Sequence, residues 1–203
     1  MPSLYNVKPR FVAPLRPATA MLASAGVTAN QLTVLAAALS CGLGFLLAMR
    51  PDAQRLWLLL PIFLAARMTL NAIDGILARE HGLKSPRGAV LNELGDVISD
   101  SALYLPFALH PGVTAAWVVL AVVLAIMTEM AGVVAVQIGA KRRYDGPLGK
   151  SDRAALFGGI GLVVGLGVAP GAWFDGLMMV AAALLALTIV NRCRLALREV
   201  AGA

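Results

Sequence analysis

The residues best suited to chemistry lie in the segment 71–100, which is flanked by long apolar runs. Asn71 and Asp74 are three residues apart, and Asn92 and Asp96 are four apart, so each pair falls on one face of a helix. An unpaired carboxylate in lipid costs about 2.5 to 3.5 kcal/mol even on insertion scales. Facing carboxylates therefore need a cation, and ligands that offer only oxygen favour a hard ion such as Mg²⁺ or Mn²⁺. Because hard ions commonly bind phosphates, the segment indicates phosphoryl chemistry.

These charges have a simpler explanation, in which they belong to a loop and to helix ends that water solvates. That explanation suits Glu80, Lys84 and Arg87, which lie in or close to the short polar turn GLKSPRG. It suits Asp74 and Asp96 poorly, because both recur on one face within apolar sequence. Gly75 follows Asp74 and leaves room for a ligand or another backbone to approach.

The composition places these helices in a membrane. The chain has 203 residues, of which 59% are hydrophobic and 14% charged, whereas a typical soluble domain is about a quarter charged. We therefore expect a polytopic membrane protein. The net charge of +6 then indicates membrane topology and lipid headgroups, and we expect no nucleic-acid partner. Cys41 and Cys193 fall in apolar runs and are predicted to be buried packing residues without a disulfide.

The hydropathy pattern predicts an all-α integral membrane protein with six transmembrane helices and an N-terminal interfacial amphipathic helix. The segment 10–26 mixes apolar residues with Arg10 and Arg16 and is expected to lie along the headgroups. We expect a single domain over 1–203, with 1–27 as the juxtamembrane helix and 28–203 as the bundle. The predicted spans, each near 20 residues, are 31–49, 56–78, 89–109, 113–140, 154–168 and 173–195.

The distribution of Lys and Arg predicts the orientation. Only Arg50 and Arg55 fall between spans on one side, and the remaining basic residues outside the spans fall on the other. Positive charge marks the cytoplasmic side, so both termini and the charged segment are expected there. In the fifth span, Gly161 and Gly165 are four residues apart and permit close helix contact, either within the chain or between subunits.

The spacing in 71–96 resembles the motif of the CDP-alcohol phosphotransferase family. That motif is an Asp, two residues, Asp-Gly, two residues, Ala-Arg, eight residues, Gly, three residues, Asp, three residues, Asp. The chain fits the register without a gap at Asp74, Gly75, Ala78, Arg79, Gly88 and Asp96. The six-span plan and the N-terminal helix also resemble the family. Further similarity, in VTANQLT, LNELGDVISD, GPLGKSDR and NRCR, points to a bacterial inner-membrane subgroup.

The chain departs from the family motif at Asn71 and Asn92, where the family has Asp. Both amides keep a carbonyl oxygen that can coordinate a metal, but neither contributes charge. Weaker metal binding, the loss of one ion, or a shifted ligand set are the expected consequences. Glu93, Asp100 or Glu129 could join the site and restore charge.

The resemblance implies a transferase of phospholipid biosynthesis that depends on Mg²⁺ or Mn²⁺. Such an enzyme moves a phosphatidyl group from CDP-diacylglycerol to the hydroxyl of a polar alcohol, which can itself be phosphorylated, and releases CMP. Asp96 matches the general base, and a homodimer is expected. The implied metal ligands are Asp74, Asp96, Asn71 and Asn92.

The resemblance also implies which residues bind the substrates. Gly75, Ala78, Arg79 and Gly88 match the residues that line the cytidine and diphosphate site. In VTANQLT, the residues Thr28, Asn30 and Thr33 either lie beside the nucleotide or simply cap the first span. In GPLGKSDR, Lys150 and Arg153 either hold a phosphate of the donor or acceptor, or serve topology and capping.

Two other kinds of function compete with an active transferase. Asn71 and Asn92 permit a catalytically impaired protein that still binds CDP-lipid. A transporter or channel would spread polar residues along the whole membrane depth, whereas here they cluster toward the cytoplasmic end, with Arg67, Glu129 and Gln137 as the main exceptions.

Overall fold

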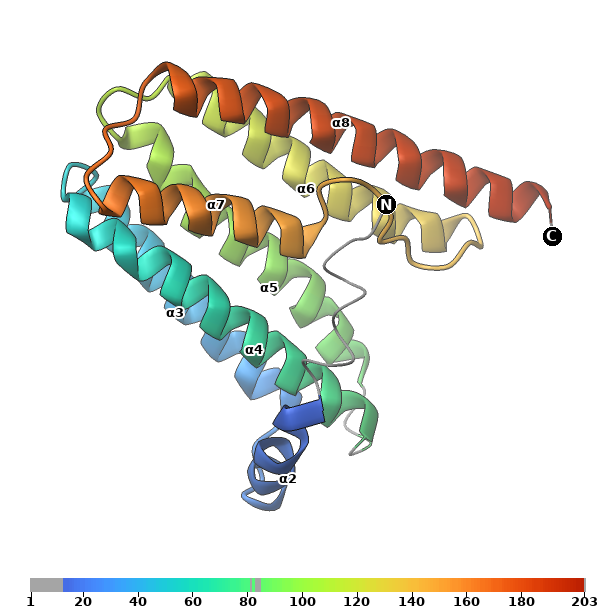
Figure 1. Cartoon of the computed structure of the whole chain (residues 1–203). Coiled ribbons are helices and arrows are strands. Elements are labelled where there is room, and N and C mark those ends of the chain that lie inside the picture. Colours follow the sequence, from blue (N-terminus) through green and yellow to red (C-terminus); the bar gives the residue numbers. More distant parts are fainter. Residues whose placement is uncertain (1–12, 81, 83–84, 203) are drawn as a thin grey trace.

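A computed structural model of the chain describes residues 13–80, 82 and 85–202, and every regular element among them is helical (Figure 1). This confirms the predicted all-α class. The short helices are η2 (Ala13–Leu15), α2 (Arg16–Ser24), η3 (Gln54–Leu58) and η4 (Leu105–Leu109). The long helices are α3 (Ala29–Met49), α4 (Leu59–Glu80), α5 (Pro86–Tyr104), α6 (Ala115–Gln137), α7 (Lys150–Gly165) and α8 (Ala172–Ala201).

Each predicted span corresponds to one long helix. By length and composition, four stretches can cross a membrane, namely Ala29–Met49, Gln54–Glu80, Ala115–Gln137 and Ala172–Ala201. Helix α5 carries several acidic residues, and α7 is only 16 residues long. A multi-pass membrane protein is therefore supported, and the count of six crossings stays a prediction.

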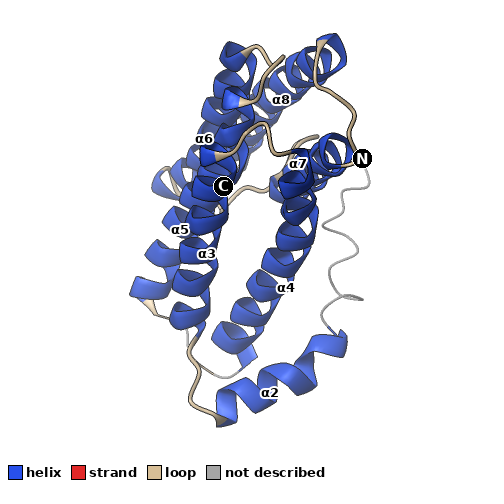
Figure 2. Ribbon diagram, turned by 90° about the vertical axis from the view of Figure 1, so that its left-hand side faces the viewer, coloured by secondary structure: helices blue, strands red, loops and turns tan. Residues whose placement is uncertain are grey.

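The long helices form one bundle in which sequence-distant helices are neighbours. Helix α3 packs along α4 and α5, α4 packs on α7, and α6 packs along α8 (Figure 1). Helix α2 lies across the ends of α3 and α4 (Figure 2), and Nη2 of Arg16 is 3.1 Å from Oε1 of Glu80 on α4. The predicted N-terminal helix is thus observed from Ala13 onward, with Pro17 in its first turn; residues 10–12 lie outside the described residues.

The outward faces of the bundle are strongly apolar. Phe45 and Ile62, for example, are each 68% exposed, which suits contact with lipid chains rather than water. Cys41 and Cys193 are also exposed, so the prediction that they are buried was wrong. An apolar run in a membrane helix does not distinguish the lipid-facing side from the core, because both are apolar.

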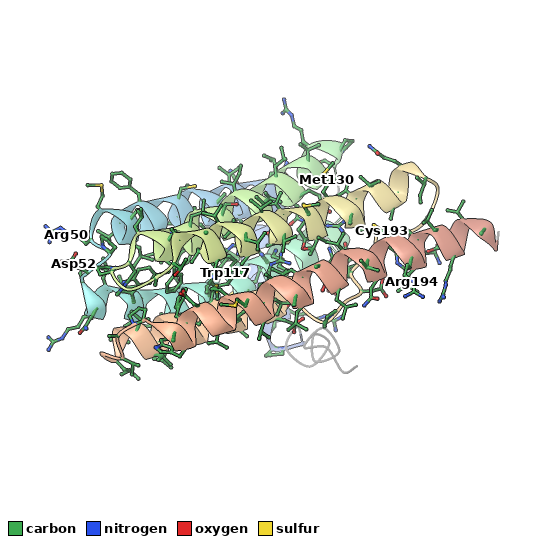
Figure 3. All side chains as sticks on the ribbon, turned by 90° about the horizontal axis from the view of Figure 1, so that it is seen from above. Arg50, Asp52, Trp117, Met130, Cys193 and Arg194 are labelled. Atoms are coloured by element: carbon green, nitrogen blue, oxygen red, sulfur yellow. The ribbon has the colours of Figure 1, made fainter. Side chains whose placement is uncertain are left out.

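The two ends of the bundle differ in the side chains that they bury. Arg50 and Asp52 lie at one end, and Cys193 and Arg194 lie toward the other (Figure 3). Near the first end the core is aromatic: the rings of Trp57 and Phe107 stack at 4.1 Å, and those of Tyr104 and Phe157 at 3.9 Å. We call this the aromatic end. The opposite end, toward Cys193 and Arg194, is called the charged end. Gly161 and Gly165 of α7 pack against Trp57, Leu58 and Leu60, so this pair serves contact within the chain.

Candidate active site

A cavity of about 840 Å³ lies between the helices at the charged end of the bundle. Helices α3, α4, α5 and the start of α7 contribute most of its wall. All of the predicted site residues except Thr28 and Arg153 line it: Asn30, Thr33, Asn71, Asp74, Gly75, Ala78, Arg79, Gly88, Asn92, Asp96 and Lys150. Residues separated by up to 120 positions in the sequence therefore share one space.

Helical periodicity explains why the polar side chains of α3, α4 and α5 point into the same cavity. On α4, Asn71, Asp74 and Ala78 share one face and all line the wall. The Asp74 side chain accepts a hydrogen bond from the hydroxyl of Thr33 on α3, with 3.1 Å between Oγ1 and Oδ2. The Asn71 amide donates to Oδ1 of Asp96 on α5, at 3.4 Å. The polar faces of three helices are thus tied together.

Cations surround the carboxylate of Asp96. Nη2 of Arg67 lies 3.3 Å from its Oδ1, and the ammonium of Lys150 forms an ion pair with its Oδ2. Asp74 lines the same cavity as Asp96 and Lys150. Because Arg67 lies four residues before Asn71, the sequence allowed it to neutralise part of the acidic site, and the structure pairs it with Asp96 and Asp100.

The oxygen atoms available to a metal come from two carboxylates and two amides. Asp74 and Asp96 carry charge, whereas Asn71 and Asn92 offer only amide oxygens. Within the described residues, no three His, Cys, Asp or Glu side chains gather so that they could hold a metal. The donor chemistry fits a hard divalent ion, but with half the negative charge that four carboxylates would supply.

Two glycines leave space that other side chains fill. A Cβ atom at Gly75 would lie 3.2 Å from Nη1 of Arg79, whose guanidinium folds back over it. A Cβ atom at Gly88 would lie 2.8 Å from Oδ1 of Asn30. Ser85 begins α5 by accepting a hydrogen bond from the Gly88 amide, at 3.0 Å. Both glycines therefore keep the wall close to the space that a ligand would occupy.

The first turn of α7 faces the cavity. Gly149, Lys150, Ser151 and Asp152 all line it, and Oδ2 of Asp152 accepts from the Gly149 amide at 3.0 Å. The remaining first-turn N–H groups and the positive end of the helix dipole suit an anion.

The structure places Thr28 and Arg153 outside the cavity wall. Thr28 caps α3, since its hydroxyl accepts from the Gln31 amide at 3.3 Å. Arg153 is 1% exposed and donates to Thr128, Asp100 and Glu129 at 3.1, 3.1 and 2.9 Å. The predicted contact of Arg153 with a substrate phosphate does not fit this arrangement, because its side chain points away from the cavity toward Asp100 on α5 and Glu129 on α6.

Asp100 does not restore the charge missing from the site. It is buried outside the cavity wall, and its carboxylate oxygens receive Arg67 at 2.6 Å and Arg153 at 3.1 Å. Asp100 lies one helical turn beyond Asp96, and this displacement takes it out of the cavity wall. Its function in the fold is to pair two buried arginines.

Sequence reasoning did not find the full set of ion pairs behind the cavity. Glu129 on α6 lies 2.9 Å from Arg142, 2.9 Å from Arg153 and 3.6 Å from Arg192. Arg142 also binds Glu93 through two hydrogen bonds of 2.8 and 2.7 Å. Glu93, Glu129, Arg142 and Arg192 line the cavity. The signal in the sequence was Glu129 itself, a single acid in an apolar helix that requires a partner.

Arg142 fixes the loop between α6 and α7 to the wall. Burial alone would lower the pKa of its guanidinium, but hydrogen bonds and charge interactions with Glu93 and Glu129 raise the pKa above its ordinary value. A Cβ atom at Gly132 would collide with the Arg142 guanidinium, so only glycine leaves room for it. Tyr144, two residues further along the loop, completes this side of the wall.

Residues 26–193 match the family model described as CDP-alcohol phosphatidyltransferase. The chain belongs to this family. It is 48% identical over 192 residues to the Escherichia coli inner membrane protein YnbA, covering 95% of both chains. It is 33% identical over 109 residues to an archaetidylinositol phosphate synthase of Pyrococcus horikoshii, covering 52% of this chain and 54% of that protein.

The fold also matches that of a solved structure. A crystal structure of Mycobacterium tuberculosis phosphatidylinositol phosphate synthase (PgsA1) with CDP-DAG bound aligns with a TM-score of 0.72 at 20% identity. The alignment covers 91% of this chain and 92% of that one. The family match confirms the predicted family and enzyme class, a CDP-alcohol phosphatidyltransferase, and the solved structure confirms the fold.

Proposed function

We propose that this transferase moves a phosphatidyl group from CDP-diacylglycerol to the hydroxyl of a polar alcohol and releases CMP. The observation that carries the proposal is the shared cavity, in which the motif residues from α4 and α5 face one space of about 840 Å³. That volume lies within the range of small-molecule sites. The related mycobacterial synthase has been crystallised with CDP-DAG bound, which supports the same donor here.

The nucleotide and diphosphate are assigned to the side formed by α3, α4 and the start of α5. Gly75, Ala78, Gly88 and Asn30 form a close wall there. Among the described residues, Arg79 is the one lining cation without an ion pair. Its guanidinium is thus available to donate to phosphate oxygens.

The transfer step needs a base, which we assign to Asp96. The acceptor hydroxyl oxygen attacks the phosphorus that carries diacylglycerol, its proton passes to Asp96, and the bond from that phosphorus to the CMP oxygen breaks. Mg²⁺ or Mn²⁺ held by Asp74, Asp96, Asn71 and Asn92 would stabilise negative charge on the diphosphate. In this structure both oxygens of Asp96 are occupied by cations, so Lys150 has to withdraw before the proton is taken.

A phosphorylated alcohol is the acceptor that the opposite wall favours. Lys150 and the amide groups at the start of α7 offer positive charge there. The archaeal and mycobacterial relatives are both, by name, inositol phosphate lipid synthases. This makes a sugar or polyol phosphate the first class of acceptor to test.

We further propose that the whole chain, 1–203, is one domain that crosses the bacterial inner membrane six times and acts as a homodimer. Arg79, Arg142, Lys150 and Arg192 line the cavity at the charged end, which supports cytoplasmic termini and a cytoplasmic site. The similarity to an inner membrane protein of Escherichia coli supports the location.

The test is release of CMP by purified protein in mixed micelles of CDP-diacylglycerol with Mn²⁺. Glycerol phosphate, inositol phosphate and their unphosphorylated counterparts serve as acceptors, and mass spectrometry of the lipid product identifies the headgroup. CMP release with at least one acceptor is expected. If no acceptor yields CMP, the active-enzyme proposal is wrong.

A catalytically impaired CDP-lipid-binding protein is the second candidate, and one observation favours it. Asn71 and Asn92 halve the acidic charge of the motif, and Lys150 neutralises part of what remains. Asp96→Asn separates the two candidates. An enzyme loses turnover while it still binds CDP-lipid, whereas for a binding protein the variant rescues a deletion strain as well as the original chain.

A further inference from the structure

Lys150 places a positive charge next to the Asp96 carboxylate, which we expect to be a metal ligand. It is the first residue of α7, its side chain is 31% exposed, and its ammonium contacts Oδ2 of Asp96. The other oxygen of Asp96 faces Arg67 and Asn71. Lys150 therefore occupies the side of the carboxylate that faces the cavity, the side from which a metal ion would bind.

The charges of the site add up to little attraction for more than one divalent ion. Of the four motif side chains that line the cavity from α4 and α5, only Asp74 and Asp96 are charged, and the neighbouring Glu93 is paired with Arg142. Lys150 cancels one of these charges. What remains for a metal is the carboxylate of Asp74, the two amide oxygens and the phosphates of a substrate.

We propose that the Lys150 ammonium is a resident cation of this site, so that the chain binds a single divalent ion and uses Lys150 where a second positive charge is needed. The inference rests on the proposed phosphatidyl transfer, in which the diphosphate brings its own negative charge. Lys150 then moves from Asp96 to that diphosphate as the substrate enters. A flexible four-carbon stem and a compact charge suit such a movement.

The chain offers matched variants for a direct test of this assignment. Lys150→Met removes the charge at Asp96 and keeps most of the side-chain volume. Lys150→Arg keeps the charge. Lys141→Met removes a charge from the preceding loop, where Lys141 is exposed and does not line the cavity.

The measurement is Mn²⁺ binding to the full-length protein in detergent, followed by the loss of the free-ion signal in electron paramagnetic resonance. The original chain is expected to bind one Mn²⁺. Lys150→Met is expected to bind one Mn²⁺ about tenfold more tightly, because a like charge next to the ion has gone. Lys150→Arg and Lys141→Met are expected to stay within about twofold of the original chain.

A second comparison tests the number of ions. Asn71→Asp and Asn92→Asp combined with Lys150→Met restore two carboxylates and remove the lysine, so this triple variant is expected to bind two Mn²⁺. Two ions on the original chain, or equal affinities for the original chain and Lys150→Met, would overturn the proposal. A single ion on the triple variant would also overturn it.

CMP release measured on the same preparations keeps this proposal separate from the proposed function. Absent CMP release with the expected Mn²⁺ stoichiometries overturns the transferase activity and retains Lys150 as the resident cation. CMP release with two Mn²⁺ on the original chain retains the activity and overturns the role of Lys150.

Discussion

At the aromatic end of the bundle, rings of α5, η3, η4 and α7 stack on one another, whereas the charged end buries carboxylates among arginines. Phe107 and Phe157 at the first end are buried, and their rings need no polar partner. Arg153 and Arg192 at the second end are equally enclosed but depend on Glu129 and on main-chain or hydroxyl oxygens.

This difference separates stability from chemistry. Stacked apolar side chains stabilise a fold, and the loss of one such contact leaves no buried charge without a partner. Buried ion pairs contribute little net stability, and removing one partner is costly. A chain that keeps so many ions at one end therefore uses them to shape a site, and the predictions below test that division.

The largest expected effect is on catalysis at the charged end. Asp96→Asn is expected to lower CMP release by about 10²- to 10⁴-fold, the usual contribution of a general base. Arg67 keeps its 2.6 Å ion pair with Asp100, so the melting temperature should change little. Asp145→Asn, which alters an ion pair in the loop with Arg143, is the control and should retain activity. Activity in Asp96→Asn close to that of the original chain would contradict the assignment of the base.

Removal of Glu129 should destabilise the charged end. Glu129→Ala leaves Arg142, Arg153 and Arg192 without their shared carboxylate, which is expected to cost about 3 to 5 kcal/mol. Phe107→Ala is the matched change at the aromatic end, with a similar cost of about 3 to 5 kcal/mol. Thermal unfolding in detergent measures both variants.

Activity distinguishes these two variants. At a temperature where both remain folded, Phe107→Ala should keep its activity per folded molecule, because Phe107 does not line the cavity. Glu129→Ala should lose activity as well as stability. If the two variants lose activity equally, the proposed division between the ends is wrong.

Restoring the two carboxylates of the motif should make the charged end bind a metal ion more tightly. In the double variant Asn71→Asp and Asn92→Asp, two added charges at the cavity are expected to lower the metal concentration for half-activity by about tenfold or more. A chelator should also lower the melting temperature more in this variant than in the original chain. Asn191→Asp adds a charge on α8 outside the cavity wall and serves as the control. An unchanged or weaker metal requirement in the double variant would contradict the charge argument.

The smallest effect is expected from Gly75→Ala. Its Cβ atom would press on the Arg79 guanidinium at about 3.2 Å, so the KM for the CDP-lipid donor should rise up to about tenfold. Stability should not fall, because Ala is favoured over Gly within a helix by about 1 kcal/mol. Gly42→Ala, where a Cβ atom meets open space, should leave KM unchanged. The same KM in both variants would show that Arg79 does not touch the donor.

The sequence predicted the helices, and helical periodicity explains why the motif residues line one cavity. Asn71 and Asp74 had to share a face of α4, and Asn92 and Asp96 a face of α5, once the helices were placed. The helical repeat gives the direction of a side chain but does not show how far the neighbouring helices bury it. Arg153 is one turn from Lys150, yet it pairs with Asp100 and Glu129 instead of facing the cavity.

The loop residues were the least predictable part of the site. Arg142 and Tyr144 line the cavity from an irregular segment, where no repeat relates sequence position to direction. The basic run KRR fits the positive-inside rule equally well. Its specific function is visible only through the space over Gly132 and the position of Glu93.

Helix α2 lies across the ends of α3 and α4 (Figure 2), the two helices that form one side of the cavity, and this position has a kinetic consequence. A lipid donor reaches such a site by lateral diffusion within the headgroup layer of the membrane. A water-soluble acceptor instead arrives from bulk water. The concentration that governs the rate is then the mole fraction of donor in the surface. Dilution with inert detergent should slow turnover even when the total amount of donor per volume is held constant.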